Sequence, residues 1–333
     1  MGAAMRGRIQ VIPGLDAATY RPSPLHAEQC AWVEKNCYVD VWIEVVHSLG
    51  LEPAAMLAMT LAVDFEGDQW TFYKPPHDEL RDLYGIDVQE LTVWRSLLEH
   101  AQEQLAAGKL ISTEADAFWM PDTAGTDYRR QHTKSTIVLA DLDVCNQRLG
   151  YFHNTGYHSL EAEDFRQLFR VGAAVDPTFM PLFAELVRLD RVVRRPEIEL
   201  RQLATRMLAR QLGLAPTVNP VSRFADRFAS ELPQLQKGDL GHYHLWAFAT
   251  IRQLGSGFEL AAAHLRWLFP DRTPRAESAV LAFQSIAQLS KTLILKTARA
   301  VNSGRALDAS ALFDEMAVAW ERGLQSANQA LGL

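Results

Sequence analysis

A cysteine stands at the point where a helix is expected to begin. Asn36 is a suitable N-cap, Cys37 takes the first helical position, and apolar residues then recur on one helical face until Gly50. Backbone N–H groups at a helix start lack partners and carry the positive end of the helix dipole, so a thiolate there is stabilised as a nucleophile. The alternative is simple packing, because free cysteine is among the most buried residue types.

A reactive thiol needs a base within hydrogen-bond reach and a third group that orients this base. The informative histidine is His132, which begins a β-branched run. We expect that run to form a hairpin in which Ala140 pairs with Asn146. The same register places His132 opposite Asn154. Cysteine at a helix start, with histidine and asparagine on later strands, is the arrangement of papain-like enzymes.

Four further side chains are candidates for the oxyanion hole or for substrate binding. Gln29 and Asn36 precede the cysteine and carry side-chain amides, although eight residues separate Gln29 from the thiol and Asn36 serves equally well as a cap. Asp116 borders the pocket that the hairpin implies, where it binds an amine or closes a loop. His153 stands next to the expected orienting residue.

Composition narrows the class of protein. The chain has 333 residues, of which 48% are hydrophobic and 22% charged, with a net charge of −7, so we expect no partnership with nucleic acid or with an anionic membrane. Three cysteines are too few and too irregular for a disulfide framework or a zinc site, and no HExxH motif accompanies the histidines. We therefore predict a cytoplasmic protein that binds neither a metal nor a resident cofactor.

The pattern of apolar residues changes along the chain. Strand-like alternation and helical spacing are mixed in the first half, whereas only helical spacing is evident from about residue 160, including residues 181–195. The prediction is an α+β protein in which a papain-like cysteine-enzyme domain, residues 1–165, precedes an all-α helical bundle domain, residues 166–333.

Four runs carry a resemblance to known proteins. The runs are NCYVDVWIEVVHSLGLEP, DFEGDQWTFYKPP, DAFWMPDTAGTDYRRQHTKSTI and LGYFHNTGYHSL. Together they resemble the bacterial domain-of-unknown-function family DUF1839, and the resemblance covers most of residues 20–300. More distantly, the order of motifs resembles the papain-like N-terminal domain of butirosin-biosynthesis acyltransferases. That resemblance implies Cys37 as nucleophile and His132 as base. Its third position is acidic, where this chain has His153 and Asn154, and Asn154 is preferred because its amide oxygen accepts from an imidazole N–H.

The resemblance also implies a reaction. An aminoacyl group would pass from the phosphopantetheine thioester of an acyl or aminoacyl carrier protein to Cys37, and from there to an acceptor amine. Phosphopantetheine then belongs to the carrier, and an amino acid:carrier protein ligase is a further expected partner. Two alternatives stay open: a papain-like hydrolase, acting as amidase, peptidase or thioesterase, and a carrier-binding protein without chemistry.

An arginine-rich stretch is a candidate for carrier docking. Residues 188–210 hold seven arginines against three acids, and Arg191, Arg194 and Arg195 are the candidate contacts for an acidic carrier and its phosphate. The alternative is a solvated helix face with ion pairs four residues apart.

Overall fold

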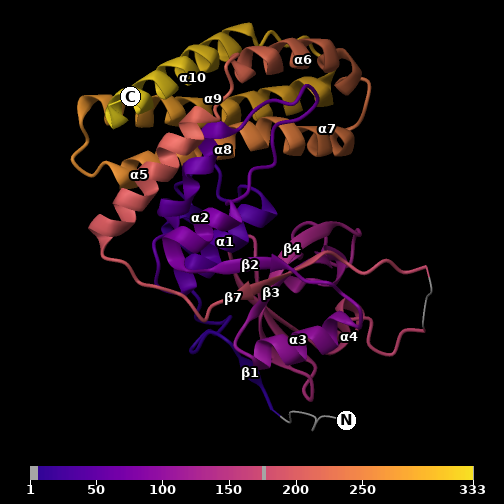
Figure 1. The fold of residues 1–333 in the computed structure, drawn as a ribbon. Helices are drawn as coiled ribbons and strands as arrows, with labels where there is room; N and C mark the ends of the chain where they lie inside the picture. The colour runs from indigo at the N-terminus through magenta and orange to yellow at the C-terminus, as the bar shows by residue number, and fades with distance from the viewer. Residues whose placement is uncertain (1–6, 175–177, 333) are drawn as a thin grey trace. The chain divides into compact units, whose positions relative to one another are not determined.

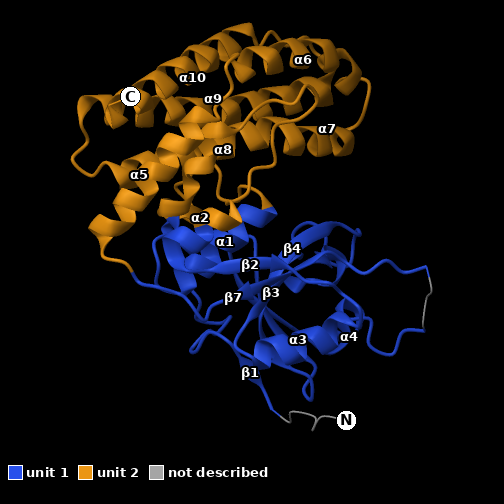
Figure 2. Ribbon diagram, viewed as in Figure 1, with its two compact units in different colours: residues 1–24, 37–53, 80–194 blue, residues 25–36, 54–79, 195–333 orange. Residues whose placement is uncertain are grey.

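Two compact units divide the chain. The computed structural model describes residues 7–174 and 178–332. Figure 2 colours the two units, which each combine several segments: residues 1–24, 37–53 and 80–194 in the first, and residues 25–36, 54–79 and 195–333 in the second. The first holds the sheet and the second is helical, so the predicted α+β class with a C-terminal helical region is confirmed. The predicted division at residue 165 is misplaced, because residues 184–188 form a further strand of the sheet.

The sheet of the first unit is antiparallel throughout. Its strand order is β2-β7-β3-β4-β5-β6, and β1 pairs with β4 outside this path. The bounds are Ile9–Gln10 for β1, Asp87–Glu90 for β2, Leu110–Asp116 for β3, Lys134–Asp143 for β4, Arg148–His153 for β5, Gly156–Glu161 for β6 and Ala184–Arg188 for β7.

Helices cover both faces of this sheet (Figure 1). Helix α1, Cys37–Ser48, packs on β4, β5 and β6. Helices α3, Leu97–Ala106, and α4, Ala162–Leu168, cover the opposite face, where Ile111, Ile137 and Tyr151 belong to the buried core. Since side chains alternate between faces along a strand, each strand contributes to both layers.

Two segments differ from their predicted form. Residues 181–195 have helical spacing, yet Ala184–Arg188 pairs with β2 on one side and β3 on the other. Residues 87–108 also have helical spacing throughout, yet they form β2 and then α3, whose start is fixed by a capping box between Ser96 and Glu99. In both segments, pairing with distant strands outweighs the local helical pattern.

The helical unit contains most of the remaining elements. Asn219 caps α6 and Thr273 caps α9, each followed by proline at the first helical position. The bounds are Pro24–His26 for η1, Pro53–Ala62 for η2, Glu197–Gly213 for α5, Pro220–Leu235 for α6, Leu240–Ala247 for α7, Phe248–Arg252 for the π-helical turn η5, Gln253–Leu268 for α8, Pro274–Ser303 for α9 and Ser310–Leu331 for α10. Helix α2, His77–Tyr84, spans the division between the units, and the short 3-10 turns η3, Ala117–Trp119, and η4, Pro121–Thr123, belong to the first.

Among the residues that the structure describes, one helix, α9, has the length and composition of a membrane span. A core helix of a globular protein passes the same test. The buried residues of α9 include Phe283, Ile286 and Leu293, and the helix packs against α8 and α10. That pattern is typical of a core helix.

Candidate functional site

Cys37 lies at the first position of α1, as predicted, and its side chain is partly exposed. The Cys37 sulfur lies 3.7 Å from the hydroxyl oxygen of Thr136 on β4. Within the described part of the chain, Thr136 is the side chain that hydrogen-bonds this sulfur. The thiol therefore faces a hydroxyl on the central sheet, where the sequence predicted an imidazole.

Polar side chains of β3 and β4 lie beside this contact, on the α1 side of the sheet. Thr136 is paired directly with Glu114 of β3, and the next pair on the same face is Lys134 with Asp116. Lys134 donates to Glu114 over 2.6 Å. The start of α1 thus stands over adjacent hydroxyl, carboxylate and ammonium groups, which together can bind a polar substrate.

His132 lies beyond the start of β4 and pairs with an acidic residue. Its Nδ1 is 2.6 Å from a carboxylate oxygen of Asp116, and its ring stacks on Phe118 with a centroid distance of 4.4 Å. Asp116 also accepts from the backbone N–H of Phe118, which fixes the carboxylate. The histidine side chain is 69% exposed. His132 and Asp116 therefore form an oriented base whose second nitrogen faces away from the carboxylate.

The predicted hairpin register is wrong. Ile137 pairs with His153 and Leu139 with Tyr151, which shifts the ladder by four residues from the expected pairing. The shift arises because β4 continues to Asp143, with a bulge near residue 140, and the turn falls at residues 144–147. His132 precedes Thr136 by four residues, about 13 Å along an extended chain. The described contacts do not bring its imidazole to the thiol, and its role as base stays a prediction.

Asn154 lies in a tight turn whose backbone conformation favours asparagine. It lies between β5 and β6 with a φ of 45°, in the left-handed region that asparagine tolerates in two-residue hairpin turns. The prediction that Asn154 orients His132 is wrong, because Asp116 makes that contact. The pairing of β4 with β5 ends at Ile137 and His153, so Asn154 lies beyond it, in the turn.

A second histidine, His153, belongs to a buried hydrogen-bond relay with Ser135, Asp122 and Tyr151 on the other face of the sheet. His153 is 1% exposed, its Nε2 lies 2.7 Å from the hydroxyl of Ser135, and its Nδ1 lies 2.5 Å from Asp122. Tyr151 also donates to Asp122. Both ring nitrogens of His153 are engaged, which contradicts its predicted role as an oxyanion or substrate contact. Sequence reasoning missed Ser135, whose only signal is its place beside Ile137 in the alternation of β4.

Burial and charge shift the pKa values of this relay. Burial acts to raise the pKa of Asp122, but the hydrogen bond from His153 and the charges of His153 and His158 outweigh it and lower this pKa. Burial raises the pKa of the Tyr151 hydroxyl well above its ordinary value, and the Asp122 charge adds to this effect. Burial lowers the pKa of His158. Asp122 is thus held as a carboxylate by the groups that surround it.

Neither amide near the cysteine is shown to point at the thiol. Asn36 is buried, and its side-chain nitrogen donates to the backbone oxygen of Tyr73 over 3.1 Å and lies 3.5 Å from the Gln253 oxygen. Gln29 lies in an exposed turn. Both residues belong to the helical unit and Cys37 to the sheet unit. Their oxyanion roles stay predictions.

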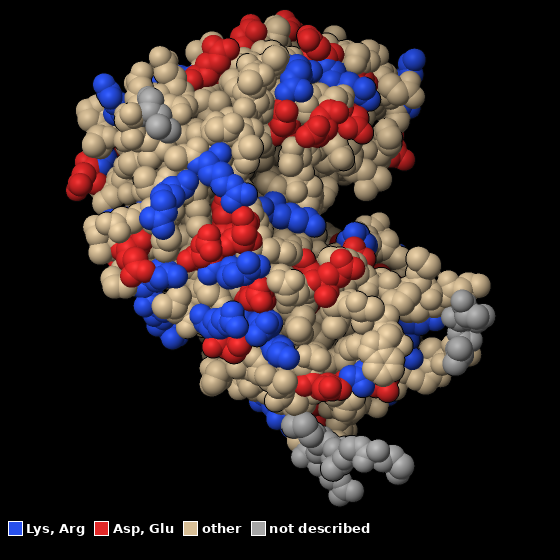
Figure 3. Space-filling view, viewed as in Figure 1, with Lys and Arg blue, Asp and Glu red and all other residues tan. Residues whose placement is uncertain are grey.

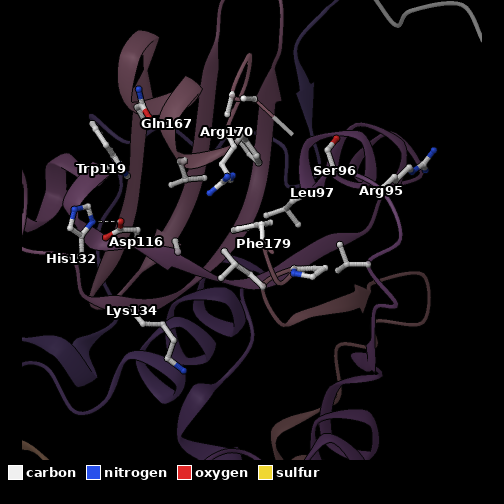
Figure 4. A pocket seen from close by; sticks show the side chains of 18 of the residues that line it. Arg95, Ser96, Leu97, Asp116, Trp119, His132, Lys134, Gln167, Arg170 and Phe179 are labelled. Carbon is white, nitrogen blue, oxygen red and sulfur yellow. Dashed lines mark hydrogen bonds and ion pairs between the residues drawn. The ribbon is translucent and has the colours of Figure 1, made fainter. Parts of the chain in front are cut away.

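A cavity of about 920 Å³ opens at the end of the sheet where β3 finishes and β4 begins. Figure 4 shows Arg170 drawn between Asp116, which is joined to His132, and Leu97 on the other side. Lys134, Trp119 and Phe179 also line it. No group of three or more metal-ligating side chains occurs among the residues described. Asp116 lines this cavity, and its predicted role in binding an amine stays a prediction.

Two of the three candidate docking arginines make contacts within the chain. Arg194 donates to the backbone oxygen of Leu49, and Arg195 pairs with Glu199 four residues later. Arg191 is exposed in the segment after β7. Figure 3 shows acidic and basic side chains interleaved on the face in view. The solvated face with ion pairs is therefore present, and carrier docking on these arginines stays a prediction.

Comparison with known families covers both units. The model of the DUF1839 N-terminal domain matches residues 21–189, and that of the DUF1839 C-terminal domain matches residues 197–329. A search of curated proteins returned no match. The two family models cover most of the chain and confirm the family resemblance that its motifs indicated.

Proposed function

This chain belongs to the DUF1839 family, and we propose that it is a cysteine-dependent acyltransferase acting on a carrier-bound aminoacyl group. The observation that carries the proposal is the partly exposed Cys37 at the start of α1, packed on an antiparallel sheet beside Thr136. A nucleophile at a helix start against such a sheet is the papain-like arrangement. Since the reaction uses cellular carrier proteins and reduced thiols, we place it in the cytoplasm.

The Thr136 contact favours a thioester donor over an amide. Cleavage of an amide needs an acid beside the sulfur, because the amine must be protonated as it leaves. The described contact of the Cys37 sulfur is a hydroxyl, and His132 lies further along the chain. A thiol leaves more readily as its anion, and exchange of one thioester for another follows the route of thiolate attack. The hydroxyl beside the sulfur therefore supports acyl transfer ahead of a peptidase or amidase.

The proposed chemistry has two steps. The Cys37 thiol gives up its proton to solvent, and its thiolate attacks the carbonyl carbon of the donor thioester. A new carbon–sulfur bond forms, the bond between that carbon and the phosphopantetheine sulfur breaks, and the departing sulfur takes up a proton from solvent. An acceptor amine then attacks the Cys37 thioester, the Cys37 sulfur leaves, and the amine proton passes to solvent. In each step the backbone N–H groups in the first turn of α1 are the proposed donors to the oxyanion.

Intact-mass spectrometry with an aminoacylated carrier protein tests this proposal. The wild-type protein should gain the mass of the aminoacyl group, and Cys37→Ala should not. Cys145→Ala is the matched control, because Cys145 is also a free cysteine and is more exposed. A gain that survives in Cys37→Ala, or that is lost in Cys145→Ala, would contradict the assignment.

A carrier-binding protein without chemistry is the second candidate, favoured by the same contact. Thr136 occupies the place beside the thiol where a papain-like enzyme needs an imidazole. A carrier protein that binds the wild-type protein without any mass gain, for every aminoacyl group loaded, would support this second candidate against the first.

A further inference from the structure

Arg170 takes a backbone position that helices usually give to glycine. It follows α4 with a φ of 54°, in the left-handed region. Its N–H donates to the Gln167 oxygen over 3.1 Å, and the next N–H, of Val171, donates to the Arg166 oxygen over 2.7 Å. These are the two bonds of a Schellman motif, in which a side chain at this position is disfavoured. Arg170 thus carries a long side chain at a position where the backbone favours glycine.

The guanidinium of Arg170 lines the cavity and stacks on an aromatic ring. It lies 4.0 Å from the ring centroid of Phe179. Lys134 and Arg95, the other cationic side chains of the wall, each pair with a glutamate, whereas Arg170 makes no ion pair with any residue in the described part of the chain. Among the described residues of the wall, Arg170 is therefore the cationic side chain without a counter-ion, and its ring contact with Phe179 holds it in place.

Most of the remaining wall is apolar. Its aromatic and aliphatic members include Trp94, Leu97, Ala115, Trp119, Leu168 and Leu182. A matching ligand therefore has one anionic group, which Arg170 can bind through two parallel hydrogen bonds, and an uncharged chain that covers apolar surface.

The cavity ends at the start of β4, the strand that also contacts the cysteine. Its wall includes Leu97 of α3 and Leu168 of α4, on the face of the sheet opposite α1. Lys134 at the end of the cavity and Thr136 beside the Cys37 sulfur are two residues apart on the α1 face of β4, about 7 Å. A phosphopantetheine arm carries a phosphate at one end and a thiol at the other, and extends as far as roughly five residues of extended chain, about 17 Å. We propose that the cavity binds this arm, with its phosphate on Arg170 and its sulfur end passing round the start of β4 to Cys37 on the other face of the sheet. The inference rests on the proposed function and adds the position of the donor arm.

Calorimetric titration of the full-length protein with S-methyl 4′-phosphopantetheine tests this site, because the methyl group blocks reaction with thiols. S-methyl pantetheine, which lacks the phosphate, should bind about ten- to a hundredfold more weakly. Arg170→Gly should lose a similar factor, about ten- to a hundredfold, for the phosphorylated ligand only. Glycine suits the backbone here, so this variant should melt no lower than wild type.

Arg272→Gly is the matched control, because Arg272 is an exposed arginine with a φ of 46° in the helical unit. It should leave both affinities unchanged. Equal affinities for the two ligands, an unchanged affinity in Arg170→Gly, or no binding at millimolar ligand would overturn the inference. Inorganic phosphate that competes as strongly as the whole arm would show a simple anion site and also overturn it.

The two proposals fail separately. Acylation of Cys37 with no Arg170-dependent binding removes the cavity assignment and keeps the acyltransferase. Arg170-dependent binding of the arm with no acylation of Cys37 removes the transferase and leaves a site for the arm.

Discussion

The Cys37 sulfur and the Thr136 hydroxyl lie 3.7 Å apart, where the first turn of α1 meets β4. A hydroxyl is a poor base at neutral pH, so it cannot remove the thiol proton as an imidazole does. It can still hold the sulfur in place. Reactivity at this position therefore depends on the helix start and on the donor, and less on a neighbouring base.

Replacing Thr136 by histidine should convert this contact into a cysteine–imidazole pair. We expect Thr136→His to be alkylated by iodoacetamide at pH 7 about tenfold faster, or more, than wild type, because a base beside the sulfur raises the thiolate fraction. Thr136→Val keeps the shape and removes the hydroxyl, and should change the rate by less than about threefold. Mass spectrometry of the labelled Cys37 peptide measures both rates, and equal rates in all three proteins would refute the expected proximity.

His132 should be dispensable for the first chemical step. Its imidazole is held by Asp116 and lies about 13 Å along the chain from Thr136. We therefore expect His132→Ala to acquire the aminoacyl mass at a rate within about threefold of wild type, since a contribution from direct proton transfer would be about a hundredfold or more. Rapid-quench mass spectrometry with a loaded carrier provides the rate, and a hundredfold loss would restore His132 as the base.

The buried relay should matter for stability. His153→Ala leaves the Asp122 carboxylate buried without its main hydrogen-bond partner, which should cost about 3–5 kcal/mol of unfolding free energy. His132→Ala, an exposed histidine with a carboxylate partner, is the control and should cost less than about 1 kcal/mol. Urea unfolding at pH 7 gives both values. Similar costs for the two variants would show that burial of the relay contributes little.

A histidine in the helical unit should make stability fall in acid. Burial lowers the pKa of His264 to about 4, although its Nδ1 donates to the Ala54 backbone oxygen. The folded state then binds fewer protons than the unfolded state, so this stability is complete above pH 6.5 and is lost as the pH falls towards 4. The loss should reach about 3 kcal/mol.

His264→Gln keeps an N–H donor and removes the titration. The difference in unfolding free energy between wild type and this variant, measured by urea unfolding from pH 7 to pH 4, should shrink as the pH falls. A constant difference over this range would mean that His264 does not titrate as expected.

Local patterns determined much of the molecule. The cap signals and apolar period of residues 36–50 place Cys37 at the start of α1, and the alternation around Ile137 predicts β4 and its hairpin. These features depend on interactions between near neighbours, which a sequence displays directly. The family motifs likewise depend only on the order of residues.

Tertiary structure alone decided which side chains meet. The register of β4 against β5 depends on where the turn falls, and a shift of four residues moved Asn154 away from His132 and set His153 beside Ser135. Residues 184–188 became a strand because β2 and β3 offered partners on both sides. Such choices depend on the total pairing and burial of distant segments, a quantity that no single stretch of sequence carries.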